Sequence, residues 1–257
     1  MLKYFRYICL IILLITSFIG TDLLVKHLKM QDPIFISIKE LENEYKKEPI
    51  NAIIEDNYII PGVNGIMLDV NYSYKKMKEK KSFLPSSLSL KEFNPDISII
   101  NNKDKIIKHA NPYKKGVSLL TISDEIANYL DKEVIPYSIL TTINNYNNNY
   151  KYGMQINNDY HHYKELDTIL TKIKQNNKFC YYSNKLYDIC LKNNKTIFTS
   201  SINLDANYLL EYKNITSGDI IFIDNNISIE GLAFVLTNIE FKGLQILPLS
   251  ILLSESR

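Results

Sequence analysis

The sequence predicts an α/β fold, and the main indication is a regular alternation of strand and helix patterns from Lys114 onward. The strand patterns there are short, apolar and rich in β-branched residues, and segments with helical periodicity stand between them. Such alternation is typical of a largely parallel sheet covered by helices. A length of 257 residues and a hydrophobic content of 46% allow one large domain or two small ones with a buried core.

Charge and composition exclude several classes of protein. The chain has 30 basic and 28 acidic side chains and a net charge of +2. Because this balance gives no general attraction to polyanions, no nucleic-acid partner is expected. Eight glycines and eight prolines are too few for a collagen-like or linker-like chain.

The first 25 residues predict a membrane anchor. Lys3 and Arg6 precede an uncharged run over residues 7–21, and residues 23–25 extend it if Asp22 lies at the membrane interface. A cleaved signal peptide is the main alternative, but the bulky Phe18 and Ile19 do not suit a cleavage site. A buried helix is a weaker alternative because the run has no polar face. The basic start predicts a single-pass protein of the cell membrane, with a cytoplasmic N-terminus and an extracellular main domain.

Two segments are expected before the main domain. Residues 26–50 read as a polar, partly helical juxtamembrane stalk, and residues 51–113 as a small α+β leader unit. The leader combines apolar runs at 52–54 and 58–60, a turn at 61–65, a strand at 66–70 and a helix at 72–81. Five lysines in this helix suit either an anionic polymer or a solvated helix face, and we expect the solvated face.

The main domain is expected over residues 114–257. Its predicted strands are 117–122, 134–142, 196–199, 219–223 and 244–247, and its predicted helices are 123–132, 163–174, 184–191 and 228–239. The helix over 163–174 has a well-formed apolar face. The asparagine-rich segment 144–149 is expected to be a loop.

The cysteines fit an extracytoplasmic location. Cys9 lies in the anchor, which leaves Cys180 and Cys190 as the only pair outside the membrane. A disulfide between them is plausible in an oxidising compartment, and two buried thiols are the alternative. Their spacing does not match a zinc finger.

The runs KGVSLLTISDE (115–125), GMQINN (153–158), GDIIFID (218–224) and KGLQILPLS (242–250) follow one another along the chain. Together and in this order they resemble four motifs of the polysaccharide deacetylases, the NodB-homology family. The run KGVSLLTISDE (115–125) is similar to the family strand that ends in Thr-Phe-Asp-Asp. The run GMQINN (153–158) resembles Gly-His-Glu-Ile-Gly-Asn, and GDIIFID (218–224) resembles Gly-Ser-Ile-Ile-Leu-Leu-His. Residues 242–250 resemble the closing Lys-Gly-Tyr-Phe-Val-Thr-Leu-Ser, and residues 60–77 resemble a leader of divergent, membrane-anchored members.

The resemblance implies a distorted, incomplete (β/α) barrel with its site at the carboxyl ends of the strands. Active members hold a divalent metal with one Asp and two His. They use a second Asp as the base and a His near the end of the domain, the late His, as the acid. In this sequence the metal Asp falls on Asp124 and the base on Ser123. The first metal His falls on Asp159 and the late His on Asp224. The second metal His falls near Tyr163, with His161 and His162 close by but out of register.

These replacements favour a membrane-anchored, extracytoplasmic polysaccharide-deacetylase-like protein of the cell envelope that has lost catalytic residues. Such a protein would bind cell-wall carbohydrate and need no cofactor. Capping explains Ser123, Asp124 and Asp159 without chemistry, because Ser and Asp are favoured where helices begin. One alternative is an active deacetylase that cleaves N-acetyl amide bonds of cell-wall glycan, with Zn²⁺ or Mn²⁺ held by rearranged ligands. A protein-interaction module of an envelope complex is a third possibility.

Overall fold

The computed structural model describes residues 2–175 and 178–257, and the chain divides into two compact units. Unit 1 comprises Met1–Glu48 and Ile66–Phe93, and unit 2 comprises Pro49–Gly65 and Asn94–Arg257. The ranges expected for a stalk (26–50) and a leader (51–113) are therefore each shared between the two units.

Unit 1 is mostly helical. Its helices are α1 (Leu2–Gln31), α2 (Pro33–Glu40), α3 (Glu42–Tyr45) and α4 (Val70–Lys80), with a 3₁₀ turn at Pro85–Ser87, and β3 (Gly65–Leu68) pairs with β4 (Leu90–Phe93). Asp32 caps α2 by accepting a hydrogen bond from the Ile34 N–H at 2.9 Å. Ile38 of α2 is buried with Leu68, Tyr74 and Met77. Part of the segment expected as a polar stalk thus contributes to a hydrophobic core.

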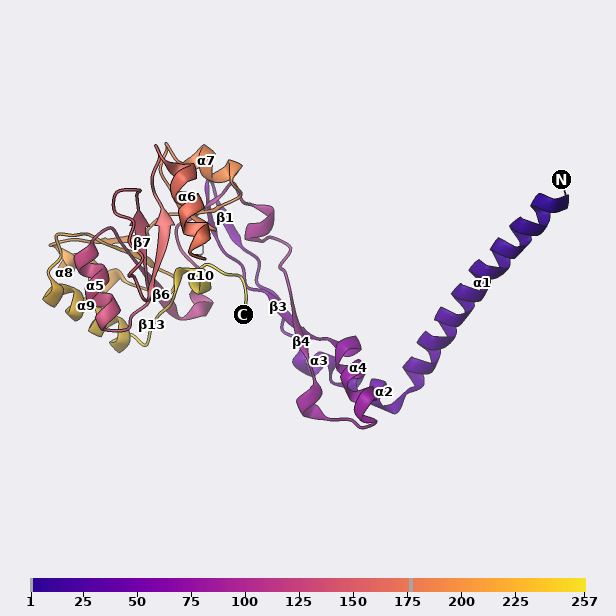
Figure 1. Ribbon diagram of the computed structural model, residues 1–257. Helices are drawn as coiled ribbons and strands as arrows, with labels where there is room; N and C mark the ends of the chain where they lie inside the picture. Colours follow the sequence, from indigo (N-terminus) through magenta and orange to yellow (C-terminus); the bar gives the residue numbers. More distant parts are fainter. Residues whose placement is uncertain (1, 176–177) are drawn as a thin grey trace. The chain divides into compact units, whose positions relative to one another are not determined.

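Unit 2 contains two sheets (Figure 1). The larger has the order β11 (Ile202–Leu204), β12 (Ile220–Ile223), β6 (Gly116–Thr121), β7 (Tyr137–Thr141), β8 (Gly153–Asn157), with β13 (Gln245–Ile246) also on β6, and its strands are parallel. The smaller has the order β1 (Ile53–Glu55), β2 (Tyr58–Ile60), β5 (Ile106–Ile107), β10 (Thr196–Phe198), β9 (Phe179–Tyr181), antiparallel between β1 and β2 and parallel elsewhere.

The two sheets share one interior. β8 lies against β9, and a buried core combines Leu120, Leu140 and Ile156 of the larger sheet with Ile107 and Phe198 of the smaller. The two remain separate sheets, which makes this an incomplete barrel. The predicted α/β fold with a largely parallel sheet is confirmed.

Helices pack around the two sheets of unit 2 (Figure 1). They are α5 (Asp124–Lys132), α6 (Tyr163–Lys172), α7 (Tyr187–Lys192), α8 (Tyr208–Glu211), α9 (Ile229–Phe241) and α10 (Leu249–Leu252), with 3₁₀ turns at Ile99–Asn101, Pro112–Lys114 and Tyr212–Asn214. Val117 and Leu119 of β6 pack against α5 and α9, whereas Leu120 faces the shared interior. Since both faces of β6 are buried, its apolar residues do not alternate with exposed polar ones.

Two backbone positions explain where strands begin. The strand predicted from residue 134 starts instead at Tyr137, because Val134 has φ 60° and the Ile135 N–H bonds back to the Leu130 carbonyl at 2.9 Å. Gly218 has φ 96°, and a Cβ there would lie 2.3 Å from the Ala110 carbonyl oxygen. Only glycine fits this approach, which fixes the entry to β12.

Candidate functional site

The carboxyl end of β6 leads into α5 through Ser123. The Ser123 hydroxyl accepts a hydrogen bond from the Ile126 N–H at 3.4 Å, and the Ser123 N–H donates to the Thr121 hydroxyl at 3.1 Å. The Thr121 hydroxyl in turn donates to the Ile223 carbonyl at 3.0 Å. Ser123, which stands where the resemblance places a base, is therefore engaged as a helix cap.

Asp124 is the first residue of α5, where the helix dipole favours a carboxylate. Its carboxylate accepts a hydrogen bond from the hydroxyl of Tyr150. Burial and this contact raise the pKa of Tyr150, so the phenol stays protonated and donates. The position expected for the metal Asp thus anchors the loop before β8 to the start of α5.

Asp159 follows β8 and is buried. One carboxylate oxygen accepts from the Ile143 N–H at 3.0 Å, and the other from the His162 N–H at 2.8 Å. Burial by itself raises the pKa of Asp159, but these hydrogen bonds outweigh it, and the pKa lies below its ordinary value. Both oxygens therefore already have partners within two loops.

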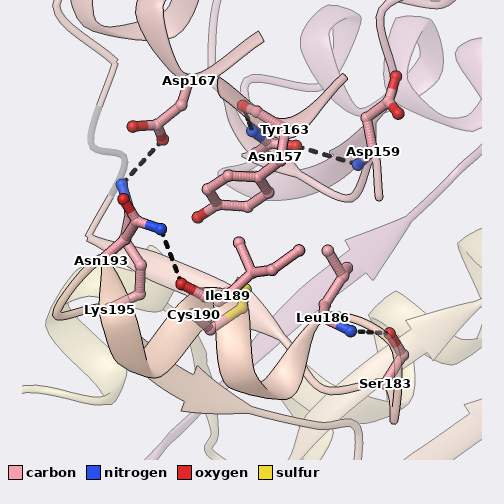
Figure 2. Close-up of a disulfide and its surroundings, with 11 residues drawn as sticks. Asn157, Asp159, Tyr163, Asp167, Ser183, Leu186, Ile189, Cys190, Asn193 and Lys195 are labelled. Carbon is pink, nitrogen blue, oxygen red and sulfur yellow. Dashed lines mark hydrogen bonds and ion pairs between the residues drawn. A yellow bond between two sulfur atoms is a disulfide. The ribbon is translucent and has the colours of Figure 1, made fainter. Parts of the chain in front are cut away.

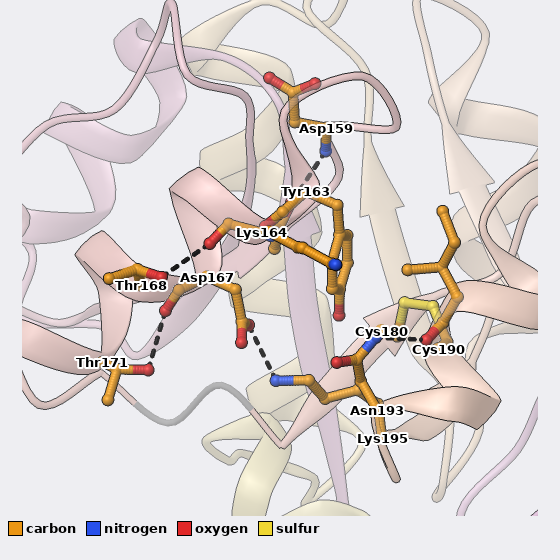
Figure 3. Close-up of polar contacts among 12 residues, drawn as sticks. Asp159, Tyr163, Lys164, Asp167, Thr168, Thr171, Cys180, Cys190, Asn193 and Lys195 are labelled. Atoms are coloured by element: carbon orange, nitrogen blue, oxygen red, sulfur yellow. Dashed lines mark hydrogen bonds and ion pairs between the residues drawn. A yellow bond between two sulfur atoms is a disulfide. The ribbon is translucent and has the colours of Figure 1, made fainter.

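The two histidines that follow Asp159 make separate local contacts. The ring of His161 makes an edge contact with the Tyr160 ring at 5.2 Å between centroids. His162 is exposed, and its Nδ1 lies 3.6 Å from Asp159 Oδ1. Figures 2 and 3 show that the hydroxyl end of Tyr163 points away from Asp159, towards Asn193 and α7.

Asp224 lies in the turn after β12. Its Oδ1 accepts a hydrogen bond from the Asn226 N–H at 3.0 Å, and its own N–H donates to the Leu204 carbonyl at 2.8 Å. This is the pattern of an Asx turn. The position expected for the late His is therefore used to shape a loop.

The residues at these positions do not fit the metal of the family. In residues 2–175 and 178–257, no group of three His, Cys, Asp or Glu side chains is placed to hold a metal ion. Asp124 and Asp159 make separate contacts with Tyr150 and Ile143. An active enzyme would need three protein ligands for Zn²⁺ or Mn²⁺, and the described residues do not bring three such side chains together.

A polar network at the carboxyl ends of β7 and β8 was not predicted from the sequence. Buried Gln155 accepts from the Thr141 hydroxyl at 3.4 Å and donates to the Asn147 carbonyl at 2.7 Å. Buried Asn157 donates to the Tyr163 carbonyl at 2.8 Å and accepts from the Asp159 N–H at 3.0 Å. Gln155 and Asn157 are two residues apart and therefore lie on one face of β8. This spacing of two polar residues in a strand is the one sequence pattern that could have indicated the network.

Cys180 of β9 and Cys190 of α7 form a disulfide in the structure, with 6.1 Å between their Cα atoms (Figure 2). This separation is within the range that a disulfide requires. Nearby, buried Lys195 and half-buried Asp167 form an ion pair at 2.8 Å that joins the start of β10 to α6 (Figure 3). No sequence pattern predicts this pair, because the two residues are 28 positions apart in the chain.

The comparisons with known proteins extend these observations. No protein-family model matches the sequence. The uncharacterized protein YlxY of Bacillus subtilis (strain 168) is 31% identical over 91 residues, which is 35% of this chain and 28% of the relative. The chain therefore matches less than a third of that protein's length.

Solved structures decide the fold. A CE4 family pseudoenzyme from Bacillus anthracis superposes with a TM-score of 0.54 at 16% identity, over 88% of this chain and 96% of that one. This chain has the CE4 fold. A mutant of that pseudoenzyme with restored enzymatic activity gives a TM-score of 0.56 at 17% identity, over 88% of this chain and all of the other. The likeness extends beyond residues 114–254, the part that the motifs cover.

Proposed function

We propose that this chain is a membrane-anchored, extracytoplasmic CE4-fold protein of the cell envelope that binds cell-wall carbohydrate without deacetylating it. The observation that supports the proposal concerns the residues at the positions where the family resemblance places catalytic and metal-binding groups. Ser123, Asp159 and Asp224 each accept backbone hydrogen bonds that shape a helix start or a turn. A fold can persist when catalytic groups are lost, so these contacts favour binding over hydrolysis.

The loss of acid–base groups has a large expected effect on rate. Positioned proton donors and acceptors typically contribute about 10²- to 10⁴-fold each. A serine hydroxyl does not replace a carboxylate base near neutral pH, and Asp224 lies in a turn with its carboxylate on the Asn226 N–H. Because a metal ligand set is also lacking among the described residues, amide hydrolysis would have neither an activated water nor a leaving-group acid.

The first helix supports the membrane part of the proposal. Residues Ile11–Gln31 of α1 form a stretch that is long and apolar enough to cross a membrane, and its most apolar part is not buried in the structure. Their exposed apolar side chains make no contact with a core that would explain them. The disulfide between Cys180 and Cys190 fits an oxidising location for unit 2.

Acetate release and glycan binding test the proposal together. The full chain in detergent is incubated with N-acetylglucosamine oligomers and Zn²⁺, Co²⁺ or Mn²⁺, and is sedimented with purified cell-wall glycan. We expect no acetate above the level of the Asp124→Asn variant, and co-sedimentation of both proteins with the glycan.

Other outcomes would select the alternatives. Metal-dependent acetate release that disappears in Asp124→Asn would establish an active deacetylase with rearranged ligands. Silence in both assays would exclude the carbohydrate and favour a protein partner in an envelope complex.

A further inference from the structure

A cavity of about 630 Å³ lies in unit 2 between the start of α6 and α7. Its walls include Tyr160 and His161 from the loop, Tyr163 and Lys164 from the first turn of α6, and Ile189 and Lys192 from α7. Ser123, Asp124 and Asp224 are not among its lining residues. The cavity is therefore separate from most of the positions that the family resemblance selects.

One wall of the cavity holds a polar group without a partner. Tyr163 is 4% exposed, and its buried hydroxyl has no hydrogen-bond partner among the described residues. In Figures 2 and 3 this hydroxyl points towards Asn193 and α7, which form the opposite wall. Leaving such a group unsatisfied costs about 1–3 kcal/mol, so an acceptor supplied from outside the chain would stabilise this hydroxyl.

The protonation state of Tyr163 makes it a donor. Burial raises the pKa of this phenol, and the negative charge of Asp167 raises it further. Tyr163 is therefore neutral in the physiological range and offers its O–H to an acceptor such as a hydroxyl, carbonyl or carboxylate oxygen.

The charges around the cavity favour an anion. Exposed Lys164 and Lys192 stand on its two walls, and Glu165 is the one carboxylate among the lining residues. Tyr160 is 45% exposed, and Lys185 Nζ lies 6.0 Å from the centre of its ring. A half-exposed aromatic ring supplies apolar surface against which the C–H face of a sugar can pack, while the lysines attract a negative group.

We propose that this cavity binds an acidic saccharide. A carboxylate of the ligand lies between Lys164 and Lys192, a ligand oxygen accepts the Tyr163 hydroxyl, and a sugar ring packs on Tyr160. The inference rests on the proposed carbohydrate-binding function and adds to it the place of the site and the charge of its ligand.

Two oligosaccharides that differ in charge test the proposal. The full chain in detergent is titrated calorimetrically with a hyaluronan tetrasaccharide, which has a carboxylate on alternate sugars, and with the neutral chitotetraose. We expect hyaluronan to bind at least about tenfold more tightly, because a charge-assisted hydrogen bond contributes more than a neutral one. Equal affinity for both, or no affinity for hyaluronan, would overturn the proposal.

Matched variants locate the binding. The double variant Lys164→Gln and Lys192→Gln is expected to lose about tenfold or more in affinity for hyaluronan. Lys132→Gln with Lys213→Gln removes the same charge from exposed positions outside the cavity and should retain the wild-type affinity. An equal loss in both double variants would mean that net charge, not this cavity, attracts the ligand.

Tyr163→Phe separates a ligand contact from a structural one. Because the hydroxyl has no partner in the part of the chain that the structure describes, its removal should leave the thermal midpoint unchanged or raise it, while affinity for hyaluronan falls about 3- to 10-fold. A wild-type affinity in this variant would remove Tyr163 from the site.

The result remains distinguishable from the test of the proposed function. Sedimentation with cell-wall glycan without hyaluronan binding would overturn this inference and leave the proposed function standing. If hyaluronan binds with the expected pattern among the variants but the protein does not sediment with wall glycan, the cavity proposal stands and the proposed cell-wall ligand is overturned.

Discussion

Asp219 precedes β12 and accepts four hydrogen bonds at the amino end of the larger sheet. The donors are the backbone N–H of Thr216 at 2.7 Å, its hydroxyl at 3.1 Å, the Ser201 hydroxyl at 2.8 Å and His109 Nδ1 at 3.0 Å. Burial by itself raises the pKa of Asp219, but these donors outweigh it and hold the pKa below its ordinary value. The negative charge of Asp219 is thus part of the folded state.

Stability should therefore fall in acid. A carboxyl group with a lowered folded-state pKa contributes its full stabilisation above the unfolded pKa of about 3.9, and loses it as the pH falls through the folded-state pKa. We expect the free energy of unfolding, measured with urea, to decrease below about pH 4. Asp219→Asn should unfold more easily at neutral pH and show a smaller decrease in acid, with Asp159 supplying the remaining slope. An unchanged acid slope in Asp219→Asn would contradict this assignment.

Val134 is a second residue whose contribution can be measured. It is 61% exposed and has φ 60°, a left-handed conformation that costs a β-branched residue about 1–2 kcal/mol. Val134→Gly removes this cost and adds unfolded-state entropy. The net effect expected is stabilisation of about 0.5–1 kcal/mol in urea unfolding. Val134→Ala retains the Cβ and serves as the control, which should gain less than glycine.

At the scale of elements, the ion pair between Asp167 and Lys195 joins α6 to the start of β10. Lys195 is 7% exposed, so its ammonium depends on protein partners for solvation. Asp167→Asn should lower the free energy of unfolding by about 2 kcal/mol or more, because the buried ammonium of Lys195 loses a charged partner. Lys195→Met should cost less, since it replaces the buried charge with an apolar chain. Equal costs for the two variants would show that the charge itself is not decisive.

The disulfide fixes α7 against β9. It closes a short loop between cysteines that are 10 positions apart in the sequence, and such a bridge stabilises a protein by about 2–3 kcal/mol through the unfolded state. Cys180→Ala with Cys190→Ala should lower the free energy of unfolding by about this amount, and reduction of the wild type should give the same loss. Thiol labelling of the denatured, unreduced chain provides the check: only Cys9 should react, and labelling of all three cysteines would exclude the bridge.

Sequence patterns identified the elements that carry strong local signals. The apolar run of β6 and the capped start of α5 at Ser123 lie within a residue or two of their predicted places. Two-residue β5 and three-residue β9 and β11 are too short for a periodic signal, and their pairing depends on distant strands. The contacts of Asp159 and Tyr150 also remained hidden, because loop geometry brings their partners together. Residue types alone could therefore place the motifs but not the cavity between α6 and α7.

At the scale of the whole molecule, the structural likeness to the CE4 pseudoenzyme covers 88% of the chain. Segments before the motif region therefore belong to the shared architecture. Within unit 2, the end of the chain reinforces this, since Glu255 accepts hydrogen bonds from the Gly62 and Ile99 N–H groups, each at 3.0 Å. Glu255 thus ties the segments next to the early strands β1, β2 and β5 to the last residues, and unit 2 combines Pro49–Gly65 with the much later part of the chain.

The long first helix decides how this molecule would be presented to its surroundings. In α1, Lys3 and Arg6 precede the apolar stretch, and the side chains described over residues 11–25 are exposed with no core to cover them. The positive-inside rule therefore predicts a cytoplasmic N-terminus and places the residues beyond about 26 outside the membrane as an expectation to be tested. Protease added to intact cells should then remove the chain beyond about residue 26 and leave a short membrane-bound stub, detected through an N-terminal tag. Permeabilised cells provide the control, because a cytoplasmic domain would be cut only there. Full-length protein recovered from protease-treated intact cells would reverse the orientation, and a tagged fragment released into the medium without protease would instead indicate cleavage of a signal peptide.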